Sequence, residues 1–335
     1  DPNVCRQLDG LLYGTVAANL NRCVDFETLS AGFTAHGIAH MPVKGYYLRK
    51  LYPTPELRTF GDIDLLIHPE DRQKVHELML SLGYTVKQDW EPTYSYIKDA
   101  EYYEIHTNLM DGNLDGRTDL QAYFDAAWAH AEPDDGLRFR PEDDFHFIYT
   151  VCHLAKHLYG GGAGLRMYLD VALYVMHKDD SLHWQAIAGE FVALHLAEFF
   201  YTVMNACRVW FGTQTICPLP EPDTEVLDRL LSYTLDSDLF GHSRDHAVIE
   251  LRNEKDEAPS RSRVLRKMLF PPAAEIESRY TFLRNRHWLL PLAWLVRLFA
   301  NLRLIPSRIC QMKQVTKTDK ASVETYDGFM RRIGL

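Results

Sequence analysis

The chain has 335 residues, of which 46% are hydrophobic and 24% charged, as in ordinary globular proteins, so it can hold one large domain or two of usual size. Its net charge of -10 argues against broad non-specific binding to nucleic acid, and no stable DNA binding is expected, although a local basic cleft is compatible with that charge. The 6 cysteines form no Cys-x-x-Cys pair, which disfavours zinc and makes a reducing interior, the cytoplasm, the simplest location.

The N-terminal part of the chain combines a helical stretch with alternating strands and helices. Residues 3–36 repeat apolar side chains at helical spacing and are predicted to be core-packing helices. The next predicted elements are strand 38–43, helix 45–52, strand 62–67, helix 70–81, strand 84–88, and a hairpin of strands near 94–99 and 102–107. This pattern predicts an α/β unit with a small mixed sheet.

A lysine and a glycine stand where the first predicted strand ends and the next helix begins. Gly45 permits close approach of the backbone to a ligand, and the unpaired N–H groups of a helix start attract an anion. Lys44 adds a point charge suited to a phosphate. Arg58 brings another positive charge shortly before the following strand. These residues indicate a phosphate site.

Two aspartates open the apolar strand 62–67, directly after Gly61. Because side chains alternate along a strand, Asp62 and Asp64 point to the same face. Two adjacent carboxylates repel each other unless a positive charge lies between them, and Mg²⁺ is the common choice where phosphates are handled. A strand that begins in solvent with two surface acids has the same spacing, so the spacing alone leaves both interpretations open.

On the predicted strand 102–107, Glu104 and His106 also share one face, and the chain as a whole carries a connected set of motifs. The set comprises Lys44-Gly45, Tyr52-Pro53, Arg58, Gly61-Asp62-Ile63-Asp64-Leu65-Leu66, Gly83-Tyr84 and Glu104-Ile105-His106. This pattern resembles the nucleotidyltransferase superfamily, most closely a poorly characterised bacterial branch often called nucleotidyltransferase family proteins. The resemblance is strongest over residues 30–110. It continues through His153–His157, Arg166–Asp170 and Leu269–Pro271.

The resemblance implies that three carboxylates are catalytic and hold Mg²⁺ or Mn²⁺ against an NTP such as ATP. These carboxylates are Asp62, Asp64 and Glu104. It also implies nucleotide or phosphate contacts, which fall on Lys44, Gly45, Arg58 and Gly61. The superfamily has a Gly-Ser pair where this chain has Lys44-Gly45, so the triphosphate contact departs from the family pattern. His106 either orients Glu104 or the acceptor, or is an ordinary strand histidine.

Residues 111–118 are predicted to be a polar loop, and residues 119–130 a helix. Residues 131–141 combine proline, glycine and charged side chains, which predicts a domain boundary there. We therefore expect an α/β (α+β) fold. It would have a small mixed-sheet nucleotidyltransferase-like domain over residues 1–135, including the N-terminal helices, and an all-helical domain over residues 136–335.

The first helix of the predicted helical domain carries polar residues on one side. Over residues 142–158, His153 and His157 lie at positions i and i+4 and share a helix face, and Lys156 is a candidate phosphate contact. The face would turn toward the cleft of the enzyme. A partly buried polar face without chemistry is the alternative.

The next loop and helix contain a second polar pair. Residues 160–164 are rich in glycine and predict a hinge rather than a phosphate loop, because no Gly-Lys-Ser/Thr sequence follows. Arg166 and Asp170 are also four positions apart, and they either pair with each other or line the cleft. The candidate acceptor-side residues are His106, His153, His157, Arg166 and Asp170.

The C-terminal part is predicted to hold helices over 181–211 and 223–239, a charged linker or exposed loop over 251–263, and an apolar segment over 288–300. That segment is too short to span a bilayer, and Arg297 interrupts it. Its flanks carry Arg284, Arg286, Arg303 and Arg308. Docking on the helical domain is the simpler prediction, and peripheral contact with an anionic membrane is the alternative.

These features predict a metal-dependent nucleotidyltransferase that moves an NMP from an NTP to a hydroxyl or similar acceptor and releases pyrophosphate. The alternative is a catalytically inactive protein of the same fold that serves in binding or assembly, which the departure at Lys44-Gly45 favours. The acceptor stays open among a small molecule, a peptide or protein, and an RNA end.

Overall fold

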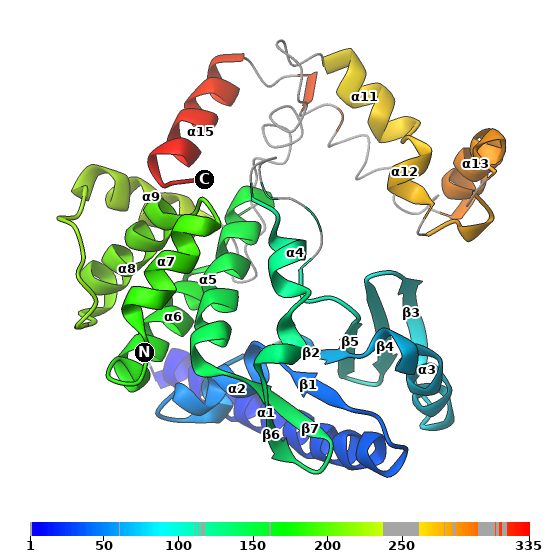
Figure 1. The fold of residues 1–335 in the computed structure, drawn as a ribbon, viewed down its shortest axis with the longest axis horizontal. Coiled ribbons are helices and arrows are strands. Elements are labelled where there is room, and N and C mark those ends of the chain that lie inside the picture. Colours follow the sequence, from blue (N-terminus) through cyan, green and yellow to red (C-terminus); the bar gives the residue numbers. More distant parts are fainter. Residues whose placement is uncertain are drawn as a thin grey trace. The chain divides into compact units, whose positions relative to one another are not determined.

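Figure 1 shows the computed structural model of the chain. The structure describes residues 2–59, 61–110, 112, 114, 118–160, 162–236, 261–277, 279–283, 286–300, 312, 315–316 and 320–335. The chain divides into two compact units. The first comprises residues 1–153, 168–197 and 206–220, and the second comprises residues 154–167, 198–205 and 221–335.

The first unit is built on a mixed sheet of seven strands in the order β3-β4-β5-β2-β1-β7-β6. The strands are β1 (His40–Pro42), β2 (Ile63–Ile67), β3 (Thr85–Trp90), β4 (Thr93–Lys98), β5 (Glu101–His106), β6 (Ala131–Asp135) and β7 (Arg138–Pro141). The middle strand β2 runs parallel to β5 and antiparallel to β1. The predicted mixed sheet is confirmed, and the five strands expected from the sequence correspond to β1 to β5.

Two helices, α1 (Pro2–Ala35) and α3 (Arg72–Ser81), contribute apolar side chains to the core that covers one face of this sheet. From β2, the side chains of Ile63, Leu65 and Ile67 are buried in that core. Because side chains alternate along a strand, the aspartates of the same segment point to the opposite face. The hydrophobic core therefore fixes the side of the sheet on which the acidic residues lie.

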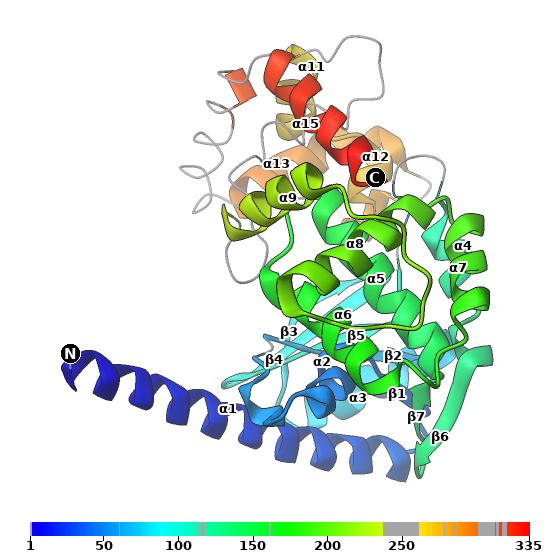
Figure 2. The same ribbon diagram turned by 90° about the vertical axis from the view of Figure 1, so that its left-hand side faces the viewer.

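Helix α1 is a single helix of 34 residues, and only its C-terminal half is buried. Phe26, Leu29 and Phe33 are at most 2% exposed, whereas Leu8 and Leu11 are 59% and 69% exposed. The prediction that the apolar positions of residues 3–36 all pack in a core is wrong for the N-terminal half. Figure 2 shows the reason, because α1 continues past the edge of the sheet that its other half covers.

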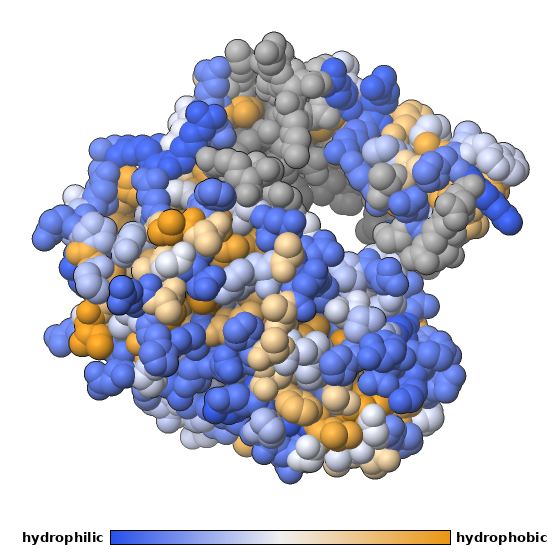
Figure 3. All heavy atoms as spheres, viewed as in Figure 1, coloured by the Kyte–Doolittle hydropathy of each residue, from blue (hydrophilic) through white to orange (hydrophobic). Residues whose placement is uncertain are grey.

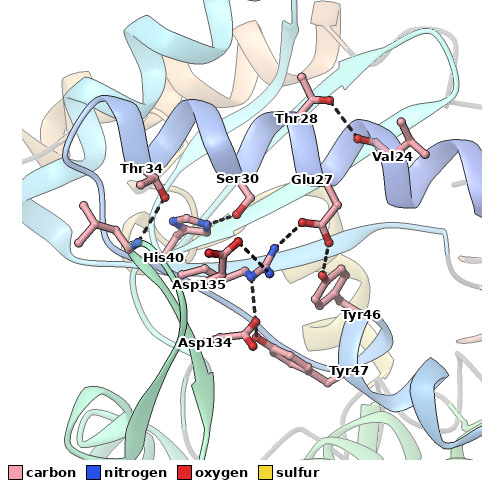
Figure 4. A network of polar contacts seen from close by, with 12 residues as sticks. Val24, Glu27, Thr28, Ser30, Thr34, His40, Tyr46, Tyr47, Asp134 and Asp135 are labelled. Carbon is pink, nitrogen blue, oxygen red and sulfur yellow. Dashed lines mark hydrogen bonds and ion pairs between the residues drawn. The ribbon is translucent and has the colours of Figure 1, made fainter.

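Residues 131–141, where the composition predicts a domain boundary, form a β-hairpin. Strand β7 pairs with β1, and the His40 N–H donates to the carbonyl of Leu137 over 3.1 Å. Arg138 fixes the hairpin to α1, since its guanidinium contacts Glu27 at 2.6 Å and Asp134 at 2.8 Å (Figure 4). The hairpin thus belongs to the sheet. A domain division at residue 135 stays a prediction.

The remaining helices of the central part are α2 (Gly45–Leu48), α4 (Leu120–Phe124), α5 (Asp143–Gly160), α6 (Leu165–Lys178), α7 (Trp184–Ala193) and α8 (Ala197–Phe211). The helix predicted over 142–158 is confirmed as α5, and the helix predicted after the glycine-rich residues 160–164 is confirmed as α6. The helix predicted over 119–130 consists of α4 followed by a 3₁₀ turn at Ala127–His130. Most of the loop predicted over 111–118 lies outside the described residues.

The second unit contains α9 (Thr224–Asp236), α11 (Arg261–Leu269), α12 (Ala273–Ile276), α13 (Leu290–Ala300) and α15 (Lys320–Arg332). Within the predicted linker 251–263, residues 251–260 lie outside the described part, and residues 261–263 begin α11. Arg284, Arg303 and Arg308 also lie outside it. Among the helices described, none combines the length and apolar character needed to cross a membrane.

Candidate active site

Parallel pairing of β2 and β5 brings two carboxylates next to each other. In the register of these strands, Asp64 lies opposite Glu104. Asp62 and Asp64 share one face of their segment, and Glu104 and His106 share one face of β5. Asp64 and His106 are buried, with 4% and 7% of their surface exposed, while the Glu104 side chain is 25% exposed. Residues 42 positions apart in sequence thus meet on one face of the sheet.

Asp64 is the centre of the polar contacts at this place. One of its oxygens, Oδ1, accepts hydrogen bonds from Lys44 Nζ at 2.7 Å and from His106 Nε2 at 2.9 Å. Since a carboxylate can only accept, His106 carries a proton on Nε2. His106 Nδ1 lies 3.1 Å from Thr93 Oγ1, and His106 Nε2 lies 3.8 Å from Glu104 Oε2. The imidazole is therefore held in a fixed orientation between the two carboxylates.

The two aspartates have pKa values displaced in opposite directions. Burial would raise the pKa of Asp64, but Lys44 and the hydrogen bond from His106 outweigh burial and hold that pKa below its ordinary value. Burial and the charge of Asp64 raise the pKa of Asp62 to about 7, and Glu104 adds to this effect. At neutral pH the site therefore holds one firmly ionised aspartate and one that is poised to gain or lose a proton.

Lys44 has an uncommon backbone conformation, with φ of 51° and ψ of -118°. L side chains rarely adopt a positive φ, and such a conformation costs about 1–3 kcal/mol, which surrounding contacts must offset. Burial would lower the pKa of Lys44, yet the charges of Asp64 and Asp62 outweigh burial and raise that pKa above its ordinary value. A strained backbone thus delivers a permanent positive charge to the acidic residues.

The helix that follows Lys44 is shorter than predicted. Instead of a helix over 45–52, α2 has four residues and continues into a 3₁₀ turn at Arg49–Leu51. A helix this short has a small dipole, so its start adds little to anion binding. Gly45 is buried at the first position of α2. The positive charge near the carboxylates therefore comes from the Lys44 side chain rather than from the helix.

Sequence analysis missed Tyr149 of α5. Its phenol is 1% exposed and lies against Lys44, and burial raises its pKa while the Lys44 charge lowers it. A hydrogen bond between the two side chains contributes to that lowering. Its ring also lies 6.0 Å from the ring of His153. A tyrosine in the middle of a helix has the pattern of an ordinary core residue, so no sequence pattern indicated this contact.

Arg58 and Asp170 form a buried ion pair. Arg58 Nε and Nη2 contact the two carboxylate oxygens of Asp170 at 2.8 and 2.7 Å, and the Tyr52 hydroxyl donates to Asp170 at 2.8 Å. Their side chains are 3% and 4% exposed. A phosphate would have to compete with this bidentate pair, which favours a role for Arg58 in the fold. The nucleotide contact of Arg58 and the acceptor-side role of Asp170 stay predictions.

The other predicted residues lie in different places. Gly61 is exposed in the bend before β2, and His153 is half-buried on α5 within the first unit. Lys156, His157 and Arg166 belong to the second unit and are half-buried. Their phosphate or acceptor-side roles stay predictions.

Comparison with known proteins decides the family. Residues 1–212 match the model of a family described as uncharacterised nucleotidyltransferase. The chain belongs to this nucleotidyltransferase family. The match includes the whole sheet and every residue of the site described above, and nucleotidyl transfer is the general activity of the family.

Two further comparisons add little to this nucleotidyltransferase assignment. Among solved structures, the antibiotic-resistance factor ANT(2'')-Ia matches over 58% of this chain and 100% of its own, with 12% sequence identity and a TM-score of 0.36. A likeness of this size supports no conclusion about the present chain. No match was found among curated proteins.

The donor atoms of the nucleotidyltransferase site fit a divalent ion. Ligand atoms of Asp64, Glu104 and His106 all lie within 4.8 Å of one another. Mg²⁺ prefers oxygen ligands, whereas Mn²⁺ also accepts an imidazole nitrogen, so this set of two carboxylates and a histidine suits either ion. Asp62 lies outside this group but interacts with Asp64 and Glu104 through its charge. His106 Nε2 donates a hydrogen bond to Asp64 here, so His106 could become a metal ligand only by releasing that proton. The sequence indicated it as an orienting residue or an ordinary strand histidine.

Proposed function

We propose that this protein is a metal-dependent nucleotidyltransferase that transfers an NMP from an NTP to a hydroxyl or similar group of an acceptor. The observation that carries the proposal is the set of buried Asp64 and His106 with partly buried Glu104, and with Lys44 on the same aspartate. A purely structural sheet gains nothing from carboxylates gathered beside a strained lysine, because their repulsion and desolvation destabilise the fold. A site for a cation and a polyphosphate explains both features.

Each residue has a role in this proposal. Mg²⁺ or Mn²⁺, held by Asp62, Asp64 and Glu104 with His106 as a further ligand, would act as a Lewis acid on the phosphate oxygens. Lys44 places a fixed positive charge where the negative charge of the triphosphate increases during transfer. Glu104, which is partly exposed, would either bind this ion or accept the proton of the acceptor hydroxyl.

The reaction balances without a further reactant. The acceptor oxygen forms a bond to the α-phosphorus while the bond from that phosphorus to the bridging oxygen breaks, and pyrophosphate leaves with that oxygen. The hydroxyl proton goes to a carboxylate of the site and then to solvent. Lys44 would hold the chain of phosphates in place during this exchange, together with the ion that the strand carboxylates would bind.

The test is release of pyrophosphate from each of the four NTPs in the presence of Mg²⁺ or Mn²⁺, with a pool of small-molecule, peptide and RNA acceptors. We expect wild-type protein to bind an NTP in a metal-dependent manner, and Asp64→Asn to lose turnover by a factor of about 10² or more. Asp180→Asn, which changes an exposed aspartate, is the control and should behave as wild type. Metal-independent NTP binding that is unchanged in Asp64→Asn would contradict the proposal.

A second candidate is a nucleotide-binding protein without turnover. It is favoured by the direct contact of Lys44 with Asp64, because an ammonium that occupies a metal ligand hinders metal binding. Such a protein would bind NTP without requiring a metal ion and would release no pyrophosphate with any acceptor. Retention of three carboxylates and a histidine in one place favours the enzyme.

A further inference from the structure

Residues 261–320 have a charge opposite to that of the chain as a whole. They contain thirteen lysines and arginines but only three aspartates and glutamates, in a chain whose net charge is -10. In the part of this segment that the structure describes, the exposed basic residues are Arg263, Arg266, Lys267, Arg279 and Arg286. A basic segment in an acidic protein favours a partner with a negatively charged surface.

Helix α13 lies within this segment. Its charged residue faces its own unit, while most of its apolar side chains are exposed, which is the reverse of a helix in water. Its only charged residue is Arg297, whose Nη1 donates inward to the carbonyl of Met268 at 3.0 Å. Trp294 donates to the carbonyl of Pro271 at 2.9 Å, and Ala293 is fully buried. These contacts fix which side of α13 faces the neighbouring helices of its own unit.

The other side of α13 and the turn before it are apolar and exposed. The exposed side chains are Trp288 (77%), Leu292 (50%), Leu295 (54%), Val296 (41%), Leu298 (52%) and Phe299 (67%). Figure 3 shows apolar side chains at the surface of this region. Six large apolar side chains exposed on one helix and the turn before it mark an interaction site rather than an ordinary solvent-facing helix.

We propose that α13 lies in the interface of an anionic membrane, with its apolar side among the acyl chains and the exposed basic residues of its own unit at the lipid headgroups. These basic residues are Arg263, Arg266, Lys267, Arg279 and Arg286. An interfacial helix combines exposed apolar residues, a tryptophan and nearby basic residues, and all three are present here. A protein partner is less suited to this surface, because protein interfaces have a polar rim and the exposed side of α13 offers no polar side chain. The proposal does not depend on nucleotidyl transfer.

The experiment is co-sedimentation of the full chain with vesicles of phosphatidylcholine alone and of phosphatidylcholine with phosphatidylglycerol at about 3:1. We expect binding to the anionic vesicles to be at least about tenfold stronger than to the neutral ones, because each basic residue near an anionic surface adds to the affinity. Binding should fall as salt is added. Failure to bind anionic vesicles would overturn the proposal.

Three variants separate the contribution of the apolar side chains to vesicle binding from that of the basic residues. Leu295→Ser/Leu298→Ser/Phe299→Ser should lose anionic-vesicle binding by about tenfold or more, and Arg266→Gln/Arg286→Gln should lose several-fold. The control is Leu8→Ser/Leu11→Ser/Tyr13→Ser, which changes equally exposed apolar residues on α1 and should bind as wild type. Circular dichroism checks that each variant is folded.

Two other results would contradict the proposal. Vesicle binding that persists in the α13 variant would show that charge alone is responsible. A dimer in vesicle-free solution that the α13 variant dissociates, measured by light scattering, would assign the surface to a second copy of the chain.

Discussion

At Asp62, burial and the charges of Asp64 and Glu104 raise the pKa to about 7 from its ordinary 3.8. Between these two values the folded protein holds a proton that the unfolded chain has released, so the stability of the metal-free protein falls as pH rises through this window. Asp62→Asn cannot ionise. We expect it to be more stable than wild type by about 1–3 kcal/mol near pH 8, and about equally stable near pH 4.

Urea unfolding at the two pH values, without divalent ions, measures this difference. Asp180→Asn serves as the control, because its side chain is exposed and its loss should change stability little at either pH. A variant that gains no stability at high pH would show that Asp62 carries no electrostatic strain. A gain in stability of Asp62→Asn near pH 8 would show that ionised Asp62 destabilises the metal-free fold.

Lys44 competes with a metal ion for Asp64, since its ammonium already contacts the carboxylate at 2.7 Å. Lys44→Met is expected to tighten Mn²⁺ binding by about tenfold or more, because one charge-assisted hydrogen bond no longer has to break. The same change should weaken NTP binding, because a positive charge beside the triphosphate is lost. Isothermal titration calorimetry with MnCl₂ and with a non-hydrolysable NTP measures both affinities.

Lys74→Met is the matched control for Lys44→Met. Lys74 also contacts an aspartate, Asp71 at 2.9 Å, but its side chain is 59% exposed. Its loss should leave both affinities unchanged. If Lys44→Met weakened metal binding instead, the lysine would have to support the metal site rather than compete with it.

Among the elements, the β6–β7 hairpin depends on one side chain. Arg138 is 10% exposed and contacts Glu27 on α1 and Asp134 on β6. Arg138→Met removes the partner of both acids, and we expect a loss of about 2–4 kcal/mol in the free energy of unfolding. Arg140→Met, on the same strand but with a 40% exposed side chain paired to Glu132, should cost less than about 1 kcal/mol.

Hydrogen exchange locates the effect of Arg138→Met. Amides of β6 and β7 should lose protection more than those of β4 and β5, because the hairpin is the element that Arg138 holds to α1. Equal loss over the whole sheet would show that the hairpin does not open separately.

The same hairpin shows how far the sequence predicts elements of this protein. Strands β1 to β5 follow from alternating or continuous apolar residues, and the same alternation predicts that Asp62 and Asp64 share a face. The hairpin was missed because its residues are mostly charged or proline, and its stability comes from pairing with β1 and from Arg138. Periodicity records local preference, whereas these contacts connect residues far apart in the chain.

Helix α1 shows the opposite kind of error, in which the sequence predicts more burial than the structure has. Its apolar repeat is continuous, so sequence periodicity predicts one buried face along its whole length. The sheet covers only the C-terminal half, and the length of a sheet cannot be deduced from the helix that packs on it. At the site, the Lys44 contact with Asp64 and the Tyr149 contact with Lys44 depend in the same way on tertiary packing.

At the scale of the whole molecule, the Arg58–Asp170 pair connects segments 112 positions apart in sequence, within the first compact unit. Both side chains are almost fully buried, so neither charge can be hydrated if its partner is removed. We expect Asp170→Asn to lose about 3–5 kcal/mol of stability, and the double variant Arg58→Met/Asp170→Leu to recover most of this loss. Urea unfolding measures both.

The double variant Arg58→Met/Asp170→Leu also tests whether Arg58 stabilises the fold or binds the nucleotide. Asp89→Asn, which changes a 55% exposed aspartate paired with Arg72, is the control and should cost less than about 1 kcal/mol. If the ion pair is structural, the double variant should still bind NTP and metal as wild type does, because Lys44 and the carboxylates are unchanged. A folded double variant that no longer binds NTP would instead place Arg58 at the phosphates, as the sequence resemblance first implied.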